Sequence, residues 1–234
     1  MYQNKKVSLV LPAFNEEKNI AKAIEDFRKI KLFDEIIVVD NNSTDKTAKL
    51  AAAKKAKVVV EKKQGYGFAL KKGMSKAAGD IIFLCEPDGT FKAKDALKLI
   101  KYLDQYDVII GTRTNEKYIQ KNANMTPFLL WGNRLLAKFI QILYQPDLSL
   151  SDCGCTFRAM KKSVVKKMLP KLKVGGSYFL AELLALTIKS NFKILEIPVT
   201  YKKRIGESKI TGSLSRSIFV GFNMFKTAVI YKFK

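Results

Sequence analysis

The sequence predicts an α/β, Rossmann-like fold with a mostly parallel central sheet flanked by helices. Through the first half, short apolar runs alternate with stretches of helical period, which is typical of βαβ units. Some runs, such as Ile81–Cys85, are apolar throughout, as expected for strands buried on both faces of a parallel sheet. The 234 residues contain no internal repeat or low-complexity linker. We therefore expect a single catalytic domain over residues 1–234.

Periodicity and turn residues predict the elements in order. Strands are expected at Val7–Leu11, Glu35–Asp40, Val58–Glu61, Ile81–Cys85, Asp107–Gly111 and Ile194–Tyr201. Helices are expected at Asn19–Lys29, Asp45–Lys55, Gly67–Ala78, Ala93–Leu103, Phe128–Tyr144, Tyr178–Lys189 and Leu214–Tyr231. Residues 114–127 should form a loop, and Leu150–Arg158 a loop and a strand. Pro198 places the last strand at a sheet edge or a bulge.

The composition is strongly basic, with 43 Lys and Arg against 21 Asp and Glu and a net charge of +22. This balance favours anionic partners, namely nucleic acid, a membrane surface or phosphorylated substrates, although solvated lysine-rich faces explain it equally well. The chain has no histidine, which excludes histidine-dependent triads and histidine-ligated zinc. An odd count of three cysteines argues against a disulfide framework.

The N-terminal residues and the hydropathy of the chain predict where the protein lies in the cell. The first six residues lack the apolar stretch of a signal peptide. No uncharged apolar run reaches the roughly 18 residues of a membrane-spanning helix. We therefore expect no transmembrane domain and a cytoplasmic protein.

Polar clusters follow three of the expected strands, where each strand ends. They are Pro12-Ala13-Phe14-Asn15-Glu16-Glu17, Asp40-Asn41-Asn42-Ser43-Thr44-Asp45 and Glu86-Pro87-Asp88-Gly89-Thr90. Ligands of open parallel sheets bind at the carboxyl ends of the strands. Three acidic clusters on one sheet edge therefore predict a ligand site, although each alone could be a turn.

Two of these clusters suggest specific chemistry. Glu86 and Asp88 are two residues apart after a buried strand and could converge on Mg²⁺ or Mn²⁺, which leaves coordination positions for water and phosphate. Asp40 could accept hydrogen bonds from a ribose hydroxyl or a base. Asn42, Ser43 or Thr44 could instead cap the helix that follows.

Together these clusters resemble the family 2 glycosyltransferases of the GT-A fold. Further stretches resemble the dolichyl- or polyprenyl-phosphate hexose synthases, and the likeness covers nearly the whole chain. These stretches are Gly111-Thr112-Arg113, Asp152-Cys153-Gly154-Cys155-Thr156-Phe157-Arg158 and Arg204-Ile205-Gly206-Glu207-Ser208-Lys209.

The resemblance implies roles for individual residues. The nucleotide-sugar site would comprise Pro12, Phe14, Glu16, Asp40, Asn42, Gly65, Gly67, Glu86, Pro87, Asp88 and Arg113. Asp88 and Glu86 would hold Mg²⁺ or Mn²⁺. Glu86 stands where relatives usually have Asp, and Thr90 where some carry Gln. Gly65 and Gly67 precede a helix, whose N-terminus could bind phosphate or could simply need a tight turn.

The acceptor decides which other residues are needed. A lipid phosphate is already anionic near neutral pH, because its second pKa is about 6, and it requires cations rather than a base. Arg113, Arg158, Arg204 and Lys209 are the candidates, the alternative being ordinary surface cations. A saccharide hydroxyl would need a carboxylate base. Asp152 and Glu182 are candidates for that role, unless Asp152 orients an arginine and Glu182 is a solvated helix residue.

The C-terminal segment, about residues 212–234, is expected to be a basic amphipathic helix. From Tyr201 to Lys234 there are eight Lys or Arg, one acidic residue and interleaved aromatics. This pattern is typical of helices that lie on a membrane surface. Alternatively, this helix and Phe128–Tyr144 pack on the sheet as core helices.

The sequence therefore predicts an inverting, metal-dependent hexosyltransferase. It would move a hexose from a GDP- or UDP-sugar to a polyprenyl or dolichyl phosphate, peripherally attached to the cytoplasmic face of a membrane. Transfer to a saccharide hydroxyl is the main alternative. A nucleotidyltransferase lacks support, since Glu16-Glu17 replace a basic glycine-rich loop. A nucleic-acid-binding protein is the distant alternative, because the acidic clusters repel phosphate.

Overall fold

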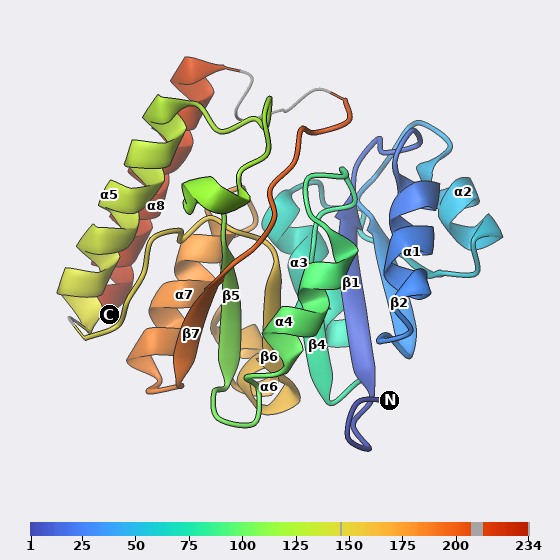
Figure 1. Ribbon diagram of the computed structural model, residues 1–234, viewed down its shortest axis with the longest axis horizontal. Helices are drawn as coiled ribbons and strands as arrows, with labels where there is room; N and C mark the ends of the chain where they lie inside the picture. The colour runs from blue at the N-terminus through green and yellow to red at the C-terminus, as the bar shows by residue number, and fades with distance from the viewer. Residues whose placement is uncertain (146, 207–212, 234) are drawn as a thin grey trace.

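The computed structural model describes residues 1–145, 147–206 and 213–233. A seven-stranded sheet runs through the molecule with helices on both faces (Figure 1). The strands are β1 Val7–Ala13, β2 Glu35–Asp40, β3 Lys57–Val60, β4 Ile81–Leu84, β5 Val108–Thr112, β6 Arg158–Lys161 and β7 Ile194–Pro198. The α-helices are α1 Ile20–Lys29, α2 Thr47–Ala53, α3 Tyr66–Lys76, α4 Ala96–Ile100, α5 Pro127–Tyr144, α6 Lys162–Met168, α7 Phe179–Lys189 and α8 Leu214–Phe233.

The strand order is β3-β2-β1-β4-β6-β5-β7. Strands β1, β2, β3 and β4 pair in parallel, as do β5 and β7. Strand β6 is antiparallel to both of its neighbours, β4 and β5. The other strands therefore share one direction, and their carboxyl ends form one edge of the sheet.

Burial explains why these segments form these elements. Every residue of β1 and β4 is buried, which matches their continuous apolar sequences. Helix α1 buries Ile20, Ile24 and Phe27 on one face, as the helical period requires. Helix α5 begins at Pro127, and the side chain of Thr126 caps it by accepting the backbone N–H of Leu129 at 3.3 Å.

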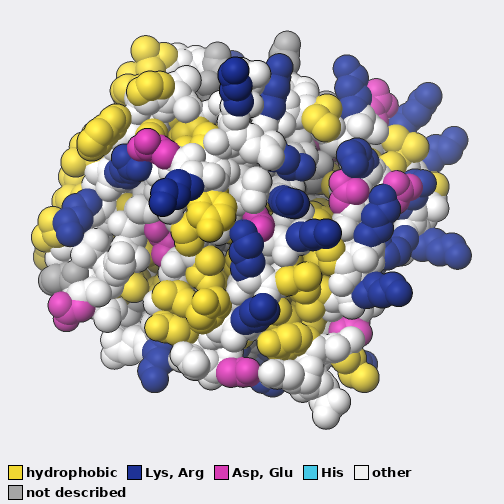
Figure 2. Space-filling view, in the orientation of Figure 1, with side chains coloured by type: hydrophobic (Ala, Val, Ile, Leu, Met, Phe, Trp, Pro, Cys, Tyr) yellow, Lys and Arg dark blue, Asp and Glu magenta, His cyan; other side chains and the backbone are white. Residues whose placement is uncertain are grey.

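The helices form two layers and a separate pair. Helices α1 and α4 cover one face of the sheet, and α3, α6 and α7 cover the other (Figure 1). Residues 179–188 of α7 are all buried. Helices α5 and α8 lie side by side beyond β7, with Phe139 and Phe225 in ring contact at 4.3 Å. Figure 2 shows hydrophobic side chains along this edge of the molecule and scattered Lys and Arg over the rest of the face.

The α/β class and the mostly parallel sheet are confirmed, and Pro198 ends the edge strand β7. Two expectations were wrong. Strand β6 begins at Arg158, where the expected strand was to end, and α6 was missed because its seven residues span too few turns for a clear period. Within the described ranges, no helix combines the length and apolarity that crossing a bilayer requires.

The segment after β7, residues 199–206, crosses the carboxyl ends of the strands. Its backbone N–H groups at Lys202 and Ile205 donate to the carbonyl oxygens of Thr90 (2.8 Å) and Asp88 (3.1 Å). Tyr201 forms isolated β-bridges with Phe91 and Ile119. We call residues 199–206 the crossing segment. It brings Arg204 over the acidic cluster that follows β4.

Candidate active site

A cavity of about 270 Å³ lies at the carboxyl ends of β1, β2 and β4. Its walls include six predicted nucleotide-sugar residues: Pro12, Phe14, Glu16, Gly65, Glu86 and Pro87. Much of the remaining wall is formed by Asn41, Tyr66, Ser177 and Arg204. We call it the donor cavity. The sheet topology thus brings together residues that are up to 192 positions apart, from Pro12 to Arg204.

Arg204 bridges two carboxylates at the mouth of this cavity. Its Nη1 lies 2.8 Å from Oδ2 of Asp88, and its Nη2 lies 2.9 Å from Oε1 of Glu16. Asn19 secures the arrangement by donating to Oε2 of Glu16 (2.7 Å) and to the carbonyl oxygen of Ile205 (2.9 Å). Burial opposes the charge on Arg204, but the attraction of Asp88, Glu86 and Glu16 outweighs it and raises the Arg204 pKa.

Asp88 is the carboxylate best suited to hold a cation. Only 1% of the residue is exposed. Its Oδ1 accepts the backbone N–H (3.0 Å) and the hydroxyl (2.6 Å) of Thr90. Its Oδ2 accepts no hydrogen bond from the described residues and is neutralised only by the Arg204 ion pair. A buried carboxylate oxygen without a donor is a place where positive charge is favoured.

Glu86 lies two residues before Asp88, in the same acidic cluster. Burial and the nearby Asp88 raise its pKa to about 7. Its Oε1 accepts the hydroxyl of Thr156 at 3.0 Å, and Thr156 in turn is hydrogen-bonded to the hydroxyl of Tyr66. Burial and the charge of Glu86 raise the pKa of Tyr66, so this phenol remains protonated. A divalent cation bound at this pair of carboxylates would take the place of the proton on Glu86.

The pair fits a divalent ion that keeps open positions. Among the described residues, no group of three Cys, Asp or Glu side chains could enclose a metal. Mg²⁺ in particular is commonly held by one or two carboxylates and completes its shell with water and phosphate oxygens. Asp88 and Glu86 match that requirement, whereas an ion that needs a complete protein cage would not be satisfied.

A second and larger cavity, of about 750 Å³, lies between α5 and α8. Apolar residues line its outer part, among them Phe128, Leu135, Phe139, Ile218, Phe222 and Phe225. At its inner end are Asp88, Arg113 and Arg204. We call it the apolar cavity. It shares the wall residues Tyr66, Glu86, Ser177 and Arg204 with the donor cavity, so the two cavities meet at the acidic cluster.

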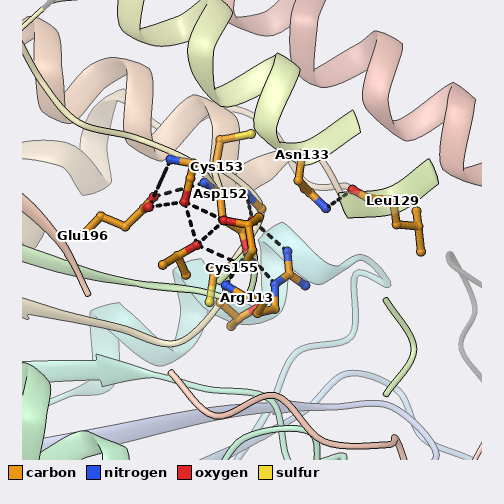
Figure 3. A network of polar contacts seen from close by, with 12 residues as sticks. Arg113, Leu129, Asn133, Asp152, Cys153, Cys155 and Glu196 are labelled. Carbon is orange, nitrogen blue, oxygen red and sulfur yellow. Dashed lines mark hydrogen bonds and ion pairs between the residues drawn. The ribbon is translucent and has the colours of Figure 1, made fainter. Parts of the chain in front are cut away.

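Arg113 is held at the inner end of the apolar cavity by a buried polar network (Figure 3). Its Nε and Nη2 lie 2.7 and 2.9 Å from the two oxygens of Asp152. Asp152 is fully buried, and its backbone N–H donates to Glu196 at 3.0 Å. Glu196 also accepts the backbone N–H of Ser151 at 2.9 Å. The network fixes the Arg113 guanidinium, whose pKa rises because the attraction of Asp152 outweighs desolvation.

The profile described as "Glycosyl transferase family 2" matches residues 8–169. The chain belongs to this family. The low-salt glycan biosynthesis hexosyltransferase Agl6 of Haloferax volcanii is 28% identical over 87% of this chain, which spans 49% of Agl6. An uncharacterised glycosyltransferase of Mycobacterium tuberculosis is 29% identical over 94% of this chain and 96% of its own length.

A solved structure supports the GT-A-like fold of this family 2 enzyme. Glucosyl-3-phosphoglycerate synthase of Mycobacterium tuberculosis, in complex with Mn²⁺, UDP and glucosyl-3-phosphoglycerate, has a TM-score of 0.74 at 20% identity. The match covers 97% of this chain and 80% of the synthase. The predicted family and fold are thereby confirmed, and the chain is a glycosyltransferase.

Two of the predicted catalytic residues do not reach the cavities of this family 2 transferase. Arg158 is 1% exposed. Its guanidinium donates to the backbone carbonyls of Cys153, Cys155 and Leu180 at 2.6, 2.8 and 3.3 Å. A role in holding the acceptor phosphate is therefore wrong. Asp152 is not a base, because both of its oxygens bind Arg113, and it orients that arginine instead.

Glu182 fits neither of the roles considered for it. It is fully buried, which excludes a solvated helix residue. Its two oxygens accept the backbone N–H groups of Lys173 (2.8 Å) and Val174 (2.9 Å), and Oε1 also accepts the Tyr231 hydroxyl. It lines neither cavity, so it is not positioned as a general base.

Several assignments are refined by position. Arg113 lines the apolar cavity rather than the donor cavity. Gly67 donates its N–H to the carbonyl of Gly175 at 2.8 Å, and a Cβ there would lie 2.6 Å from Val174 O. Close packing, rather than phosphate binding, therefore explains Gly67.

Two further donor-site residues lie near the end of β2. Asp40 ends β2 beside the donor cavity and Asn42 is exposed, so their nucleoside contacts stay predictions. Lys209 lies outside the described residues.

Three functional positions were missed from the sequence. Asn41 donates to the carbonyls of Glu61 and Lys63, both at 3.0 Å, and accepts the N–H of Gly65 at 2.8 Å. It therefore fixes the loop that walls the donor cavity. Tyr66 and Thr156 hold Glu86. Asn41 was missed because its motif was interpreted through its acidic residues. Tyr66 and Thr156 were missed because they are far apart in the sequence and only the fold brings them together.

Proposed function

We propose that this family 2 enzyme transfers a hexose from a UDP- or GDP-sugar to a polyprenyl phosphate, with inversion at the anomeric carbon. The observation that carries the proposal is the meeting of two unlike cavities at Glu86 and Arg204, beside Asp88. One is walled by the family's nucleotide-sugar motifs. The other is a long apolar cavity with two arginines at its inner end.

The donor half of the proposal rests on the acidic cluster. We expect Asp88 and Glu86 to hold Mg²⁺ or Mn²⁺, the latter being present in the solved synthase with UDP. The ion would stabilise the negative charge of the leaving diphosphate. Arg204 now lies against both Asp88 and Glu16. With these carboxylates neutralised by a bound cation, the guanidinium could contact phosphate oxygens instead.

The acceptor half rests on the chemistry of the apolar cavity. The many Phe and Leu side chains that line this cavity are suited to an isoprenoid chain. Arg113 is preoriented by Asp152 and can meet a phosphate at its inner end. A phosphate acceptor is nucleophilic without a base, so the carboxylates that line the two cavities remain available to the cation and to Arg204.

The outer surfaces of α5 and α8 support attachment to a membrane. Trp131 and Ile142 of α5, and Leu214, Phe219 and Phe233 of α8, are exposed and line neither cavity. Exposed cations, among them Lys138, Arg216 and Lys226, accompany them. Apolar and cationic side chains together favour an anionic bilayer surface. We therefore infer a peripheral position at the face where the lipid phosphate is presented.

The test is a transfer assay with UDP- and GDP-hexoses, Mn²⁺, and three acceptors: polyprenyl phosphate in detergent, 3-phosphoglycerate and an oligosaccharide. We expect label in the polyprenyl phosphate fraction and none after chelation of the metal. Label in 3-phosphoglycerate or the oligosaccharide alone would keep the donor chemistry and overturn the lipid acceptor. Transfer to the saccharide is the second candidate, as one relative is a glycan biosynthesis hexosyltransferase.

A further inference from the structure

Glu182 is a buried carboxylate that the proposed reaction does not use. It lies in the first turn of α7, fully buried, and it lines neither cavity. Its oxygens accept the N–H groups of Lys173 and Val174 at 2.8 and 2.9 Å. A buried carboxylate is stabilised when it accepts such bonds. Glu182 therefore holds the backbone of residues 173–174 in one position.

The chain that Glu182 holds packs on the start of α3. The carbonyl of Gly175 accepts the N–H groups of Gly67 (2.8 Å) and Phe68 (3.3 Å), two of the donors left free at a helix N-terminus. The fit is close, because a Cβ on Gly65 would lie 2.4 Å from Gly175 O. Gly65 and Tyr66 line the donor cavity. Residues 173–175 thus set the position of one donor-cavity wall.

The same carboxylate is contacted from α8. The Tyr231 hydroxyl donates to Oε1 of Glu182. Close by, Lys189 Nζ donates to the carbonyl oxygens of Tyr231 (3.3 Å) and Lys232 (3.2 Å). Helix α8 carries Ile218, Phe222 and Phe225 on the wall of the apolar cavity. One hydrogen-bonded route therefore joins the helix of the apolar cavity to the first turn of α3.

We infer that Glu182 is a positioning residue for nucleotide binding, and that the hydrogen bond from the Tyr231 hydroxyl helps to hold it in place. The inference rests on the proposed function, since it requires the donor cavity to bind a nucleotide. The physical reason is that residues 173–175 contact both Glu182 and α3. Loss of one bond to Glu182 lets this segment, and with it Gly65 and Tyr66, occupy more than one position.

Tyr231→Phe tests the inference against a matched control, Tyr144→Phe. Both changes remove one tyrosine hydroxyl that anchors α8, since Tyr144 donates to the carbonyl of Ala228 at 2.7 Å. Only Tyr231 contacts Glu182. Titration calorimetry with UDP and GDP, each with Mn²⁺, should show a roughly threefold to tenfold higher Kd for Tyr231→Phe. The Kd of Tyr144→Phe should stay at the wild-type value, while both variants lower the melting temperature similarly.

Glu182→Gln is the second variant. Its amide can accept one of the two backbone N–H groups but turns an NH₂ towards the other, so we expect a Kd at least as weak as that of Tyr231→Phe. In steady state, the donor KM should rise and the acceptor KM should not. Equal nucleotide Kd values in wild type and in both variants would overturn the inference alone. Failure of the wild type to bind either nucleotide would overturn the donor site and the proposed function with it.

Discussion

The donor cavity and the apolar cavity meet at the same four residues, yet they are built in opposite ways. On the donor side, Asn41 is buried and fixed by three hydrogen bonds to the loop that walls the donor cavity. In the apolar cavity, Phe222 of α8 is 64% exposed. This enzyme therefore positions charge with rigid groups and leaves its apolar surface to be covered by a ligand.

The difference follows from the forces involved. Ion pairs and hydrogen bonds depend steeply on distance and direction, so a diphosphate site must be preorganised. Burial of apolar surface is non-directional and scales with area, so a flexible chain needs only a suitable cavity. Substitutions in the two regions should therefore have effects of different size and kind.

The largest effect should come from Asp88→Asn, on the rigid side. The amide keeps the shape and one acceptor for Thr90 but removes the charge that faces Arg204. We expect kcat to fall about 10³-fold, since a catalytic metal contributes several kcal/mol. Transfer assays at saturating Mn²⁺ measure it, with circular dichroism as the control for folding. Activity within a factor of ten of wild type would remove Asp88 from the site.

Arg204→Lys probes the point where the two regions meet. Lysine keeps the positive charge but cannot bridge Asp88 and Glu16 as a guanidinium does. We expect kcat/KM for the acceptor to fall roughly 10²-fold. The variant Lys203→Arg, on the neighbouring residue, is the control and should retain activity. If Arg204→Lys affected only the donor KM, Arg204 would belong to the donor region alone.

Glu86→Gln should change how stability depends on pH. Burial and Asp88 raise the Glu86 pKa from 4.5 to about 7, so the folded metal-free protein holds a proton that the unfolded chain releases. The stability from this group is present in full below pH 4.5 and is lost as pH rises through 7. Between pH 4.5 and 8, wild type should lose about 3 kcal/mol relative to Glu86→Gln. Urea unfolding in EDTA measures this, and parallel pH profiles would contradict it.

The smallest effect should come from the apolar side. Phe222 and Phe219 are 64% and 65% exposed on the same helix, but only Phe222 lines the apolar cavity. Phe222→Ser should raise the KM for polyprenyl phosphate roughly tenfold, since part of an aromatic surface is no longer covered. Phe219→Ser should leave that KM unchanged and weaken binding to anionic vesicles only. Equal KM changes would mean that the cavity is not the lipid site.

The donor side was largely predictable from the sequence, and the acceptor side was not. Each donor motif follows a strand directly, so strand order alone places Pro12, Glu16 and Asp88 on one edge. The role of Arg158 could not be read in this way, because an arginine in a motif looks the same whether it faces a phosphate or three carbonyl groups. Only the burial of its whole side chain separates the two cases.

The reversed strand β6 explains a second group of surprises. In a parallel sheet, catalytic residues are sought after the strands, whereas Asp152 and Thr156 precede β6. An antiparallel strand starts at the edge where its neighbours end, so its leading loop reaches the site. Glu182 was misread because a carboxylate on an apolar helix has no local partner in the sequence. Its partners lie eight, nine and 49 residues away.

The Arg204 bridge gives the unliganded enzyme an internal counter-ion. A free divalent cation would have to displace a tethered guanidinium, whose effective concentration near Asp88 is of millimolar order or higher. The apparent affinity for free cation then falls by the fraction of molecules in which the bridge is open. A cation that arrives already chelated by a nucleotide diphosphate brings anionic oxygens to which Arg204 can donate in exchange. The enzyme would thus respond to the supply of its sugar donor rather than to fluctuations in cellular magnesium.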